Sequence, residues 1–144
     1  MSLSRLGRIV LVAIALFAAG CGSTAVGGEH PPASLDPTSP RISADGIAFD
    51  TATLTVPADR PFTLIFENRE AVPHNVSIYA EDADGDRRFE GAVFSGPATR
   101  WYPVPALVAG TYVFRCDVHP GMTGHLVASG NLSERIARAG GPIG

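Results

Sequence analysis

Residues 112–124, YVFRCDVHPGMTG, combine an alternating strand pattern with three side chains that commonly bind metals. Successive side chains of a strand point to opposite faces, so the two aromatic residues and Cys116 share one face. The thiol of Cys116 is therefore predicted to point into an apolar interior. Pro120 and Gly121 disfavour a helix in the following residues, because proline lacks an amide hydrogen and glycine permits positive φ. The stretch thus predicts a strand that leads into a loop.

Three potential metal ligands follow one another in this stretch at intervals of three residues. A loop can bring Cys116, His119 and Met122 around one point. Thiolate and thioether are soft ligands and imidazole is intermediate, a combination that favours copper over magnesium or calcium. Copper sites of this kind use two histidines, one cysteine and a distant methionine, so one histidine must come from elsewhere. His74 is the best candidate, because it lies in the sequence VPHNV between two apolar, strand-like segments.

The chain from residue 41 onward consists of short apolar runs separated by Pro, Gly and Asp, without helical periodicity. This pattern predicts an all-β domain. His125 lies on a predicted strand after the loop and is expected to be a surface residue. Residues 81–88 are acidic but lack the ligand order of a calcium loop, which predicts a solvated turn. Strands are expected at residues 47–49, 53–56, 62–67, 75–79, 100–104, 111–116 and 124–128.

The chain begins with an apparent export signal. Residues 1–20 contain two arginines, an apolar run too short to span a bilayer, and small residues at the end. These are the features of a cleaved signal peptide. The last residues before and including Cys21, AAGC, resemble a bacterial lipobox, in which Cys21 receives a lipid and becomes the mature N-terminus. Alanine stands at position 18, where that motif usually has leucine, and ordinary secretion with Cys21 lost or free is the alternative.

Two further segments are predicted to flank the folded domain. Residues 21–40 are rich in Pro, Gly and Ser and predict a flexible linker, in which His30 is a solvated residue. The domain is expected at residues 41–129. Residues 130–144 form a tail in which a short helix can begin near Asn131 and end at the glycine pair 140–141.

Charge and cysteine content narrow the possible functions. The 144 residues carry 11 basic and 14 acidic side chains, a net charge of −3, which falls to −5 without the two arginines of the signal. No basic stripe remains to attract nucleic acid. The 124 residues that follow the predicted signal are enough for one domain with one hydrophobic core. If Cys21 is lipidated, Cys116 has no disulfide partner, and metal binding explains such a thiol in an exported protein. The alternatives are a Cys21–Cys116 disulfide and an inert buried thiol.

Taken together, these segments resemble the cupredoxins, the small blue copper electron-transfer family. The stretch from Tyr112 to Gly124 resembles the C-terminal ligand loop, and its short Cys-x-x-His-x-x-Met spacing is most similar to the amicyanin type. Residues 72–75 resemble the upstream ligand segment, and 46–49 and 62–68 the strands before it. The resemblance covers residues 42–128. It implies a Greek-key β-sandwich with one copper ion, cycling between Cu(I) and Cu(II), at one end.

The resemblance also implies a role for each site residue. Cys116 would be the thiolate ligand, His74 and His119 the imidazole ligands, and Met122 the weak axial ligand. The side chain and amide of Asn75 would tie the two ligand segments together near the sulfur, as hydrogen bonds around metal ligands commonly do. An apolar surface around His119 would dock redox proteins briefly.

These features predict a monomeric one-electron carrier that is not an enzyme. A lipid on Cys21 would hold it at the outer face of the cell membrane or in the periplasm. A copper-delivery protein with the same ligands is the main alternative. A thiol enzyme built on Cys116 and His119 is disfavoured, because nothing supplies an orienting group or an oxyanion site. A multicopper oxidase is disfavoured because the sequence contains one ligand set and no His-x-His pair.

Overall fold

The computed structural model describes residues 24–80 and 85–130. The predicted signal peptide, the lipidation site at Cys21, the start of the acidic turn at 81–84 and the C-terminal helix lie outside these residues. Within the described ranges, no helix is long and apolar enough to cross a membrane.

The described residues are organised as β-strands joined by turns and loops, as the apolar pattern predicts. All seven expected strands appear with bounds within two residues at either end, and the strand expected at 75–79 begins two residues later than expected. The strands are β1 (Arg41–Asp45), β2 (Ala48–Phe49), β3 (Thr53–Pro57), β4 (Phe62–Asn68), β5 (Pro73–His74), β6 (Ser77–Ala80), β7 (Arg87–Glu90), β8 (Phe94–Ser95), β9 (Ala98–Val104), β10 (Gly110–Arg115) and β11 (Thr123–Ser129).

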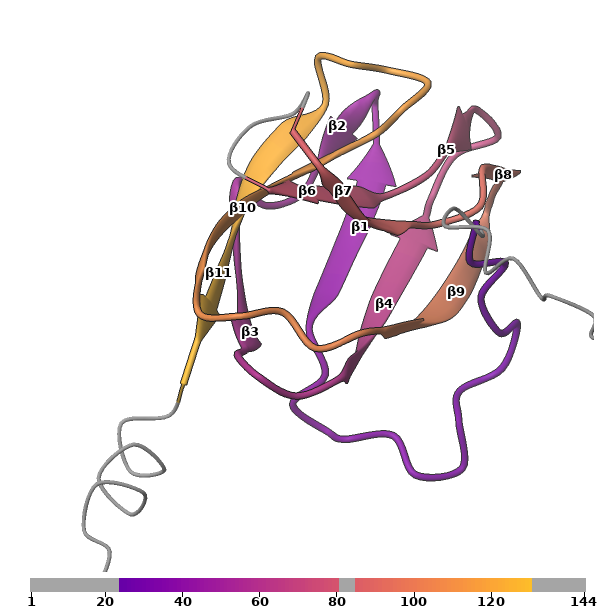
Figure 1. The fold of residues 1–144 in the computed structure, drawn as a ribbon. Coiled ribbons are helices and arrows are strands. Elements are labelled where there is room, and N and C mark those ends of the chain that lie inside the picture. The colour runs from indigo at the N-terminus through magenta and orange to yellow at the C-terminus, as the bar shows by residue number, and fades with distance from the viewer. Residues whose placement is uncertain (1–23, 81–84, 131–144) are drawn as a thin grey trace, which may run out of the picture.

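Two sheets pack face to face and form a β-sandwich (Figure 1). One has the order β2–β1–β4–β9, and the other has the order β3–β11–β10–β6–β7. Strands β1 and β4 pair in parallel, as do β3 and β11, so the chain crosses between the sheets in the manner of a Greek key. The short pair β5–β8 lies at the same end as β2 and the β10–β11 loop. The predicted all-β Greek-key sandwich is confirmed.

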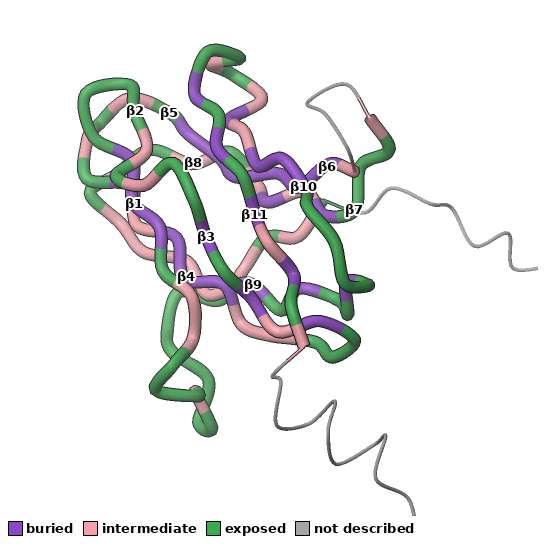
Figure 2. Tube along the Cα trace, turned by 90° about the vertical axis from the view of Figure 1, so that its left-hand side faces the viewer, coloured by how far each residue is buried: buried purple, intermediate pink, exposed green. Residues whose placement is uncertain are grey.

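The core between the sheets is apolar and close-packed. Buried stretches alternate with exposed ones along β3 and β11, because one face of each strand is turned inward (Figure 2). At the end that contains the β10–β11 loop, Phe49 packs edge-on against Phe114 with ring centroids 5.2 Å apart, and Phe66 packs against Phe94 at 5.5 Å. This cluster of aromatic side chains forms the part of the apolar core that lies beneath the loop.

Residues 25–29, which were expected within the flexible linker, contact both sheets. Ala25 forms a parallel bridge with Gly91, directly after β7, and Gly28 forms an antiparallel bridge with Trp101 of β9. We call residues 25–29 the N-terminal strap. In Figure 1 the first described residues, in indigo, run beside β8 and β9 before the chain loops around the far end of the sandwich. Glu29 also pairs with Arg100 at 3.0 Å.

Candidate metal centre

Two separate parts of the chain bring a thiol and two imidazoles together. His74 ends β5, and Cys116 and His119 follow β10. The Sγ atom of Cys116 lies 3.7 Å from Nδ1 of each histidine, and the two Nδ1 atoms are 3.2 Å apart. The side chains of His74 and Cys116 are fully buried, while His119 is partly exposed. Cys116 therefore points inward, as its position on the alternating strand predicts.

The separations among these donor atoms suit a single metal ion. Nitrogen and sulfur ligands lie about 2.0 to 2.3 Å from a bound transition metal, so donors around one ion are separated by less than twice that distance. The largest separation among the three donor atoms is 3.7 Å, well inside that limit. Two imidazole nitrogens and one thiolate form a donor set that suits copper, and carboxylate or carbonyl oxygens would be needed for magnesium or calcium.

Met122 lies at the end of the same loop and is buried within the apolar core, with 4 % of its surface exposed. Two backbone hydrogen bonds hold the loop in a compact shape. The amide of Cys116 donates to the carbonyl oxygen of Met122 at 3.0 Å, and the amide of Met122 donates to the carbonyl oxygen of His119 at 2.8 Å. The loop therefore holds Met122 close to Cys116 in the backbone, where a thioether can supply a weak additional ligand.

Glu70 fixes the orientation and the tautomer of the His74 ring. Its Oε1 atom lies 2.8 Å from Nε2 of His74 and accepts a hydrogen bond from the amide of Ile47 at 3.0 Å. The Ile47 amide, and then His74, lower the pKa of the Glu70 carboxyl. Because an ionised carboxylate only accepts hydrogen bonds, Nε2 must carry the proton. The Nδ1 lone pair of a neutral His74 is then directed toward Cys116 and His119, as in a carboxylate–histidine–metal arrangement.

Asn75 links the two segments that carry the candidate ligands. Its Oδ1 atom accepts a hydrogen bond from the amide of Asp117 at 2.7 Å, and its Nδ2 atom donates to the carboxylate of Asp117 at 2.8 Å. Burial raises the pKa of Asp117, but hydrogen bonds from Ser77, Asn75, Tyr79 and Arg115 outweigh burial and lower the pKa. The pair holds the segment after β5 against the segment after β10.

The sequence interpretation missed Glu70 and Asp117. Both are acidic residues close in sequence to candidate ligands, four residues before His74 and one after Cys116. Their partners lie on other strands, and this is why spacing alone did not indicate their roles. His30 and His125 are exposed, as expected. Within the part of the chain that the structure describes, Cys116 is a buried thiol without a disulfide partner.

Comparisons with known proteins agree with this geometry. The model of the cupredoxin-like domain family matches residues 9–128, which is most of the chain. The chain belongs to the cupredoxin family. This membership confirms the predicted family and the prediction that the chain is not an enzyme. None of the curated proteins matches this cupredoxin at a significant level.

Three solved structures illustrate what this cupredoxin resembles. Amicyanin from Paracoccus versutus is 24 % identical, with a TM-score of 0.52 over 72 % of this chain and 95 % of amicyanin. The reduced Cu(I) form of an amicyanin mutant is 25 % identical, with a TM-score of 0.51 over 71 % of this chain and 94 % of that one. Auracyanin A, a "blue" copper protein from Chloroflexus aurantiacus, is 26 % identical, with a TM-score of 0.53 over 62 % and 96 % of the two chains.

Proposed function

We propose that this cupredoxin is a one-electron carrier with a mononuclear type 1 copper site. His74, Cys116 and His119 would be the strong ligands and Met122 the weak axial ligand. The observation that carries the proposal is the convergence of the two Nδ1 atoms and the Sγ atom within 4.8 Å at one end of the sandwich. The solved blue copper relative has the same kind of fold.

At such a site the protein holds the ligand side chains in fixed positions. When bound, copper exchanges a single electron between Cu(I) and Cu(II), and no substrate bond is made or broken. His74 is held by Glu70, and Asn75 joins the two ligand segments. A site whose ligands are fixed from outside changes little between oxidation states, and a small change lowers the barrier to electron exchange. This is the behaviour that a carrier requires.

The partly exposed His119 would be the point at which electrons enter and leave. Val118 is 45 % exposed beside it, and Pro120 and Gly121 are exposed as well, so its exposed neighbours in the loop are uncharged. Such a surface favours brief docking with redox proteins through a small interface. We further propose that the protein is an exported monomer, anchored to the outer face of the cell membrane or held in the periplasm through a lipid on Cys21.

Copper delivery without electron transfer is a weaker candidate. A protein that hands its metal to a partner must expose the ligands that are exchanged. Here His74 and Cys116 have no exposed surface, and His74 is fixed by a carboxylate on its far side. The burial of both residues favours a copper ion that stays in place while electrons pass.

The test is the visible spectrum of the purified protein after addition of Cu(II), compared with Cys116→Ser. The expected result is an intense blue charge-transfer band that the substitution abolishes. The matched control is His125→Gln, which removes an exposed imidazole outside the site and should leave the band unchanged. A pale protein, or a band that survives Cys116→Ser, would refute the type 1 site. Reversible one-electron voltammetry then distinguishes a carrier from a delivery protein, and fatty-acid labelling that Cys21→Ala abolishes tests the anchor.

A further inference from the structure

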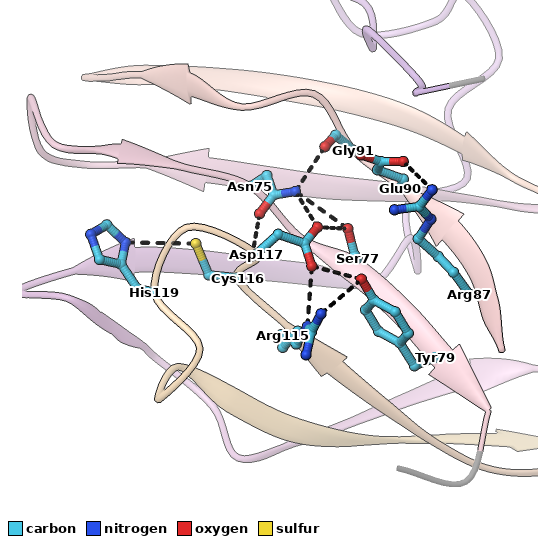
Figure 3. A network of polar contacts seen from close by, with 10 residues as sticks. All are labelled: Asn75, Ser77, Tyr79, Arg87, Glu90, Gly91, Arg115, Cys116, Asp117 and His119. Atoms are coloured by element: carbon cyan, nitrogen blue, oxygen red, sulfur yellow. Dashed lines mark hydrogen bonds and ion pairs between the residues drawn. The ribbon is translucent and has the colours of Figure 1, made fainter. Parts of the chain in front are cut away.

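Asp117 is more than a link between the two ligand segments. We infer that it is a positioning residue whose fixed negative charge lowers the reduction potential of the copper, and that Arg115 partly offsets this charge. The inference rests on the proposed copper site. It concerns a network that extends from the ligand loop along β6 and β10 and is shown in Figure 3.

The carboxylate of Asp117 is the acceptor at the centre of this network. Its Oδ2 atom accepts hydrogen bonds from the Ser77 hydroxyl and from Nδ2 of Asn75, the latter at 2.8 Å. Its Oδ1 atom accepts from the Tyr79 hydroxyl at 2.7 Å and from Nε of Arg115 at 3.1 Å. Four donors aimed at two oxygens stabilise the ionised form and hold it in one position.

Asp117 directly follows Cys116 in the sequence, so its negative charge belongs to the residue next to the one that would supply the thiolate. Cu(II) with one bound thiolate has a net charge of +1, and Cu(I) with the same ligand is neutral. A fixed carboxylate near the site therefore stabilises the oxidised form more than the reduced form. The side chain of Asp117 is only 23 % exposed, so solvent screens this charge less than it would screen a surface acid.

Arg115 provides the opposing charge on the strand that leads to Cys116. Besides its bond to Asp117, it donates to the Tyr79 hydroxyl at 3.3 Å, and its guanidinium lies 4.4 Å from the centre of the Tyr79 ring. Figure 3 shows the three side chains gathered on one side of the ligand loop. Since Arg115 and Asp117 have opposite charges at similar positions, removing one or the other should shift the potential in opposite directions.

A purely structural role predicts something different. If Asp117 only braced the loop, loss of its bonds would loosen the ligands, and loss of the Arg115 bond would loosen them in the same way. Both substitutions would then disturb the potential in the same direction. The sign of the two shifts separates an electrostatic role from a structural one.

The experiment is voltammetry of the copper-loaded full chain and three variants. Asp117→Asn should lower the ratio of the Cu(II) affinity to the Cu(I) affinity several-fold and so raise the reduction potential. A tenfold change in this ratio corresponds to about 59 mV for one electron. Arg115→Gln should move the potential the other way. Glu90→Gln is the matched control, because Glu90 is also 23 % exposed and paired with an arginine, Arg87, at 2.9 Å. It should change the affinity ratio by less than about twofold.

A second measurement needs no copper. In the apoprotein, Asp117→Asn should speed exchange of the Asn75 carboxamide protons, which lose a charged acceptor, while Glu90→Gln should not. Equal potentials in all variants of a blue protein, or shifts of the same sign for Asp117→Asn and Arg115→Gln, would overturn the inference while the proposed function stands. A wild-type protein without a blue band would overturn both. If Asp117→Asn does not fold, Arg115→Gln still tests the inference, because a raised potential in that variant would overturn it.

Discussion

Replacing Gly124 by alanine tests how tightly the strand beneath the ligand loop is packed. Gly124 lies opposite Phe114 in the β10–β11 pairing. A Cβ atom at this position would overlap Cζ of Phe114 and lie 2.7 and 2.9 Å from its Cε2 and Cε1 atoms. Because Phe114 is 1 % exposed and packs against Phe49 at 5.2 Å, the ring has no solvent-filled space to enter.

The size of the effect follows from this geometry. The Phe114 ring must retreat by roughly 1 Å to restore ordinary carbon–carbon contact at about 3.5 Å. Forcing extra volume into a packed core costs about 1–3 kcal/mol, so we expect Gly124→Ala to lower the free energy of unfolding by about 2 kcal/mol. For a domain of about 100 residues, that loss lowers Tm by about 10 °C.

Urea and thermal unfolding of the apoprotein, followed by circular dichroism, measure this change. Gly121→Ala, in the loop that precedes β11, is the control, because its Cβ would have nothing within 4 Å. It should stay within about 0.5 kcal/mol of the wild type. Adding Phe114→Leu to Gly124→Ala should cost less than the sum of the single changes, since the shorter side chain makes room. A Gly124→Ala protein as stable as the Gly121→Ala control would refute the packing argument.

Three further predictions concern other parts of the molecule. Glu70→Ala should weaken copper binding by roughly 10-fold, measured by competition with a chelator, because the His74 ring loses its orienting partner. Burial raises the pKa of Tyr102 to about 12, so above pH 10 the phenol ionises in the unfolded chain while it stays neutral in the folded protein. The wild type should therefore lose about 2 kcal/mol of stability between pH 10 and pH 12, and Tyr102→Phe should not. Gly27→Ala should destabilise the protein by about 1–3 kcal/mol, because Gly27 has φ +73° and a Cβ would lie 2.6 Å from the Tyr102 ring.

Each of these predictions can fail in a recognisable way. Unchanged copper affinity in Glu70→Ala would mean that other contacts orient His74. A Tyr102→Phe protein that loses stability as steeply as the wild type between pH 10 and pH 12 would assign that loss to other groups. A Gly27→Ala protein with wild-type stability would mean that the strap does not pack against Tyr102 in solution.

The sequence was sufficient to predict the strands that carry an alternating or continuous apolar pattern. Strands β4, β9, β10 and β11 were expected close to their observed bounds, because each has an apolar pattern that matches its buried face. The inward direction of Cys116 followed from the same alternation. The convergence of His74 with the C-terminal loop came from the chemistry of the donor set, which required one more imidazole.

Elements without an apolar signal were missed. Strand β1 buries Ser43, whose amide and hydroxyl are satisfied by the Asp50 carboxylate at 2.9 and 2.7 Å, a pairing that exists only after folding. Strand β7 begins with two exposed arginines, and the two-residue strand β8 is too short for any periodicity. The strand expected at 75–79 begins two residues late, at Ser77, because the side chain of Asn75 is used to bind Asp117.

The N-terminal strap covers part of a sheet edge, and its removal by a protease would change how the protein behaves. Strand β9 is the outermost strand of its sheet, and such strands present unpaired amides and carbonyls that invite another chain to add on. Gly28 occupies part of that row, exchanging both backbone hydrogen bonds with Trp101 at 2.9 and 3.1 Å. A chain that loses these few residues to a protease would keep its metal ligands but uncover the edge, so trimming at the N-terminus would favour self-association without touching the redox centre.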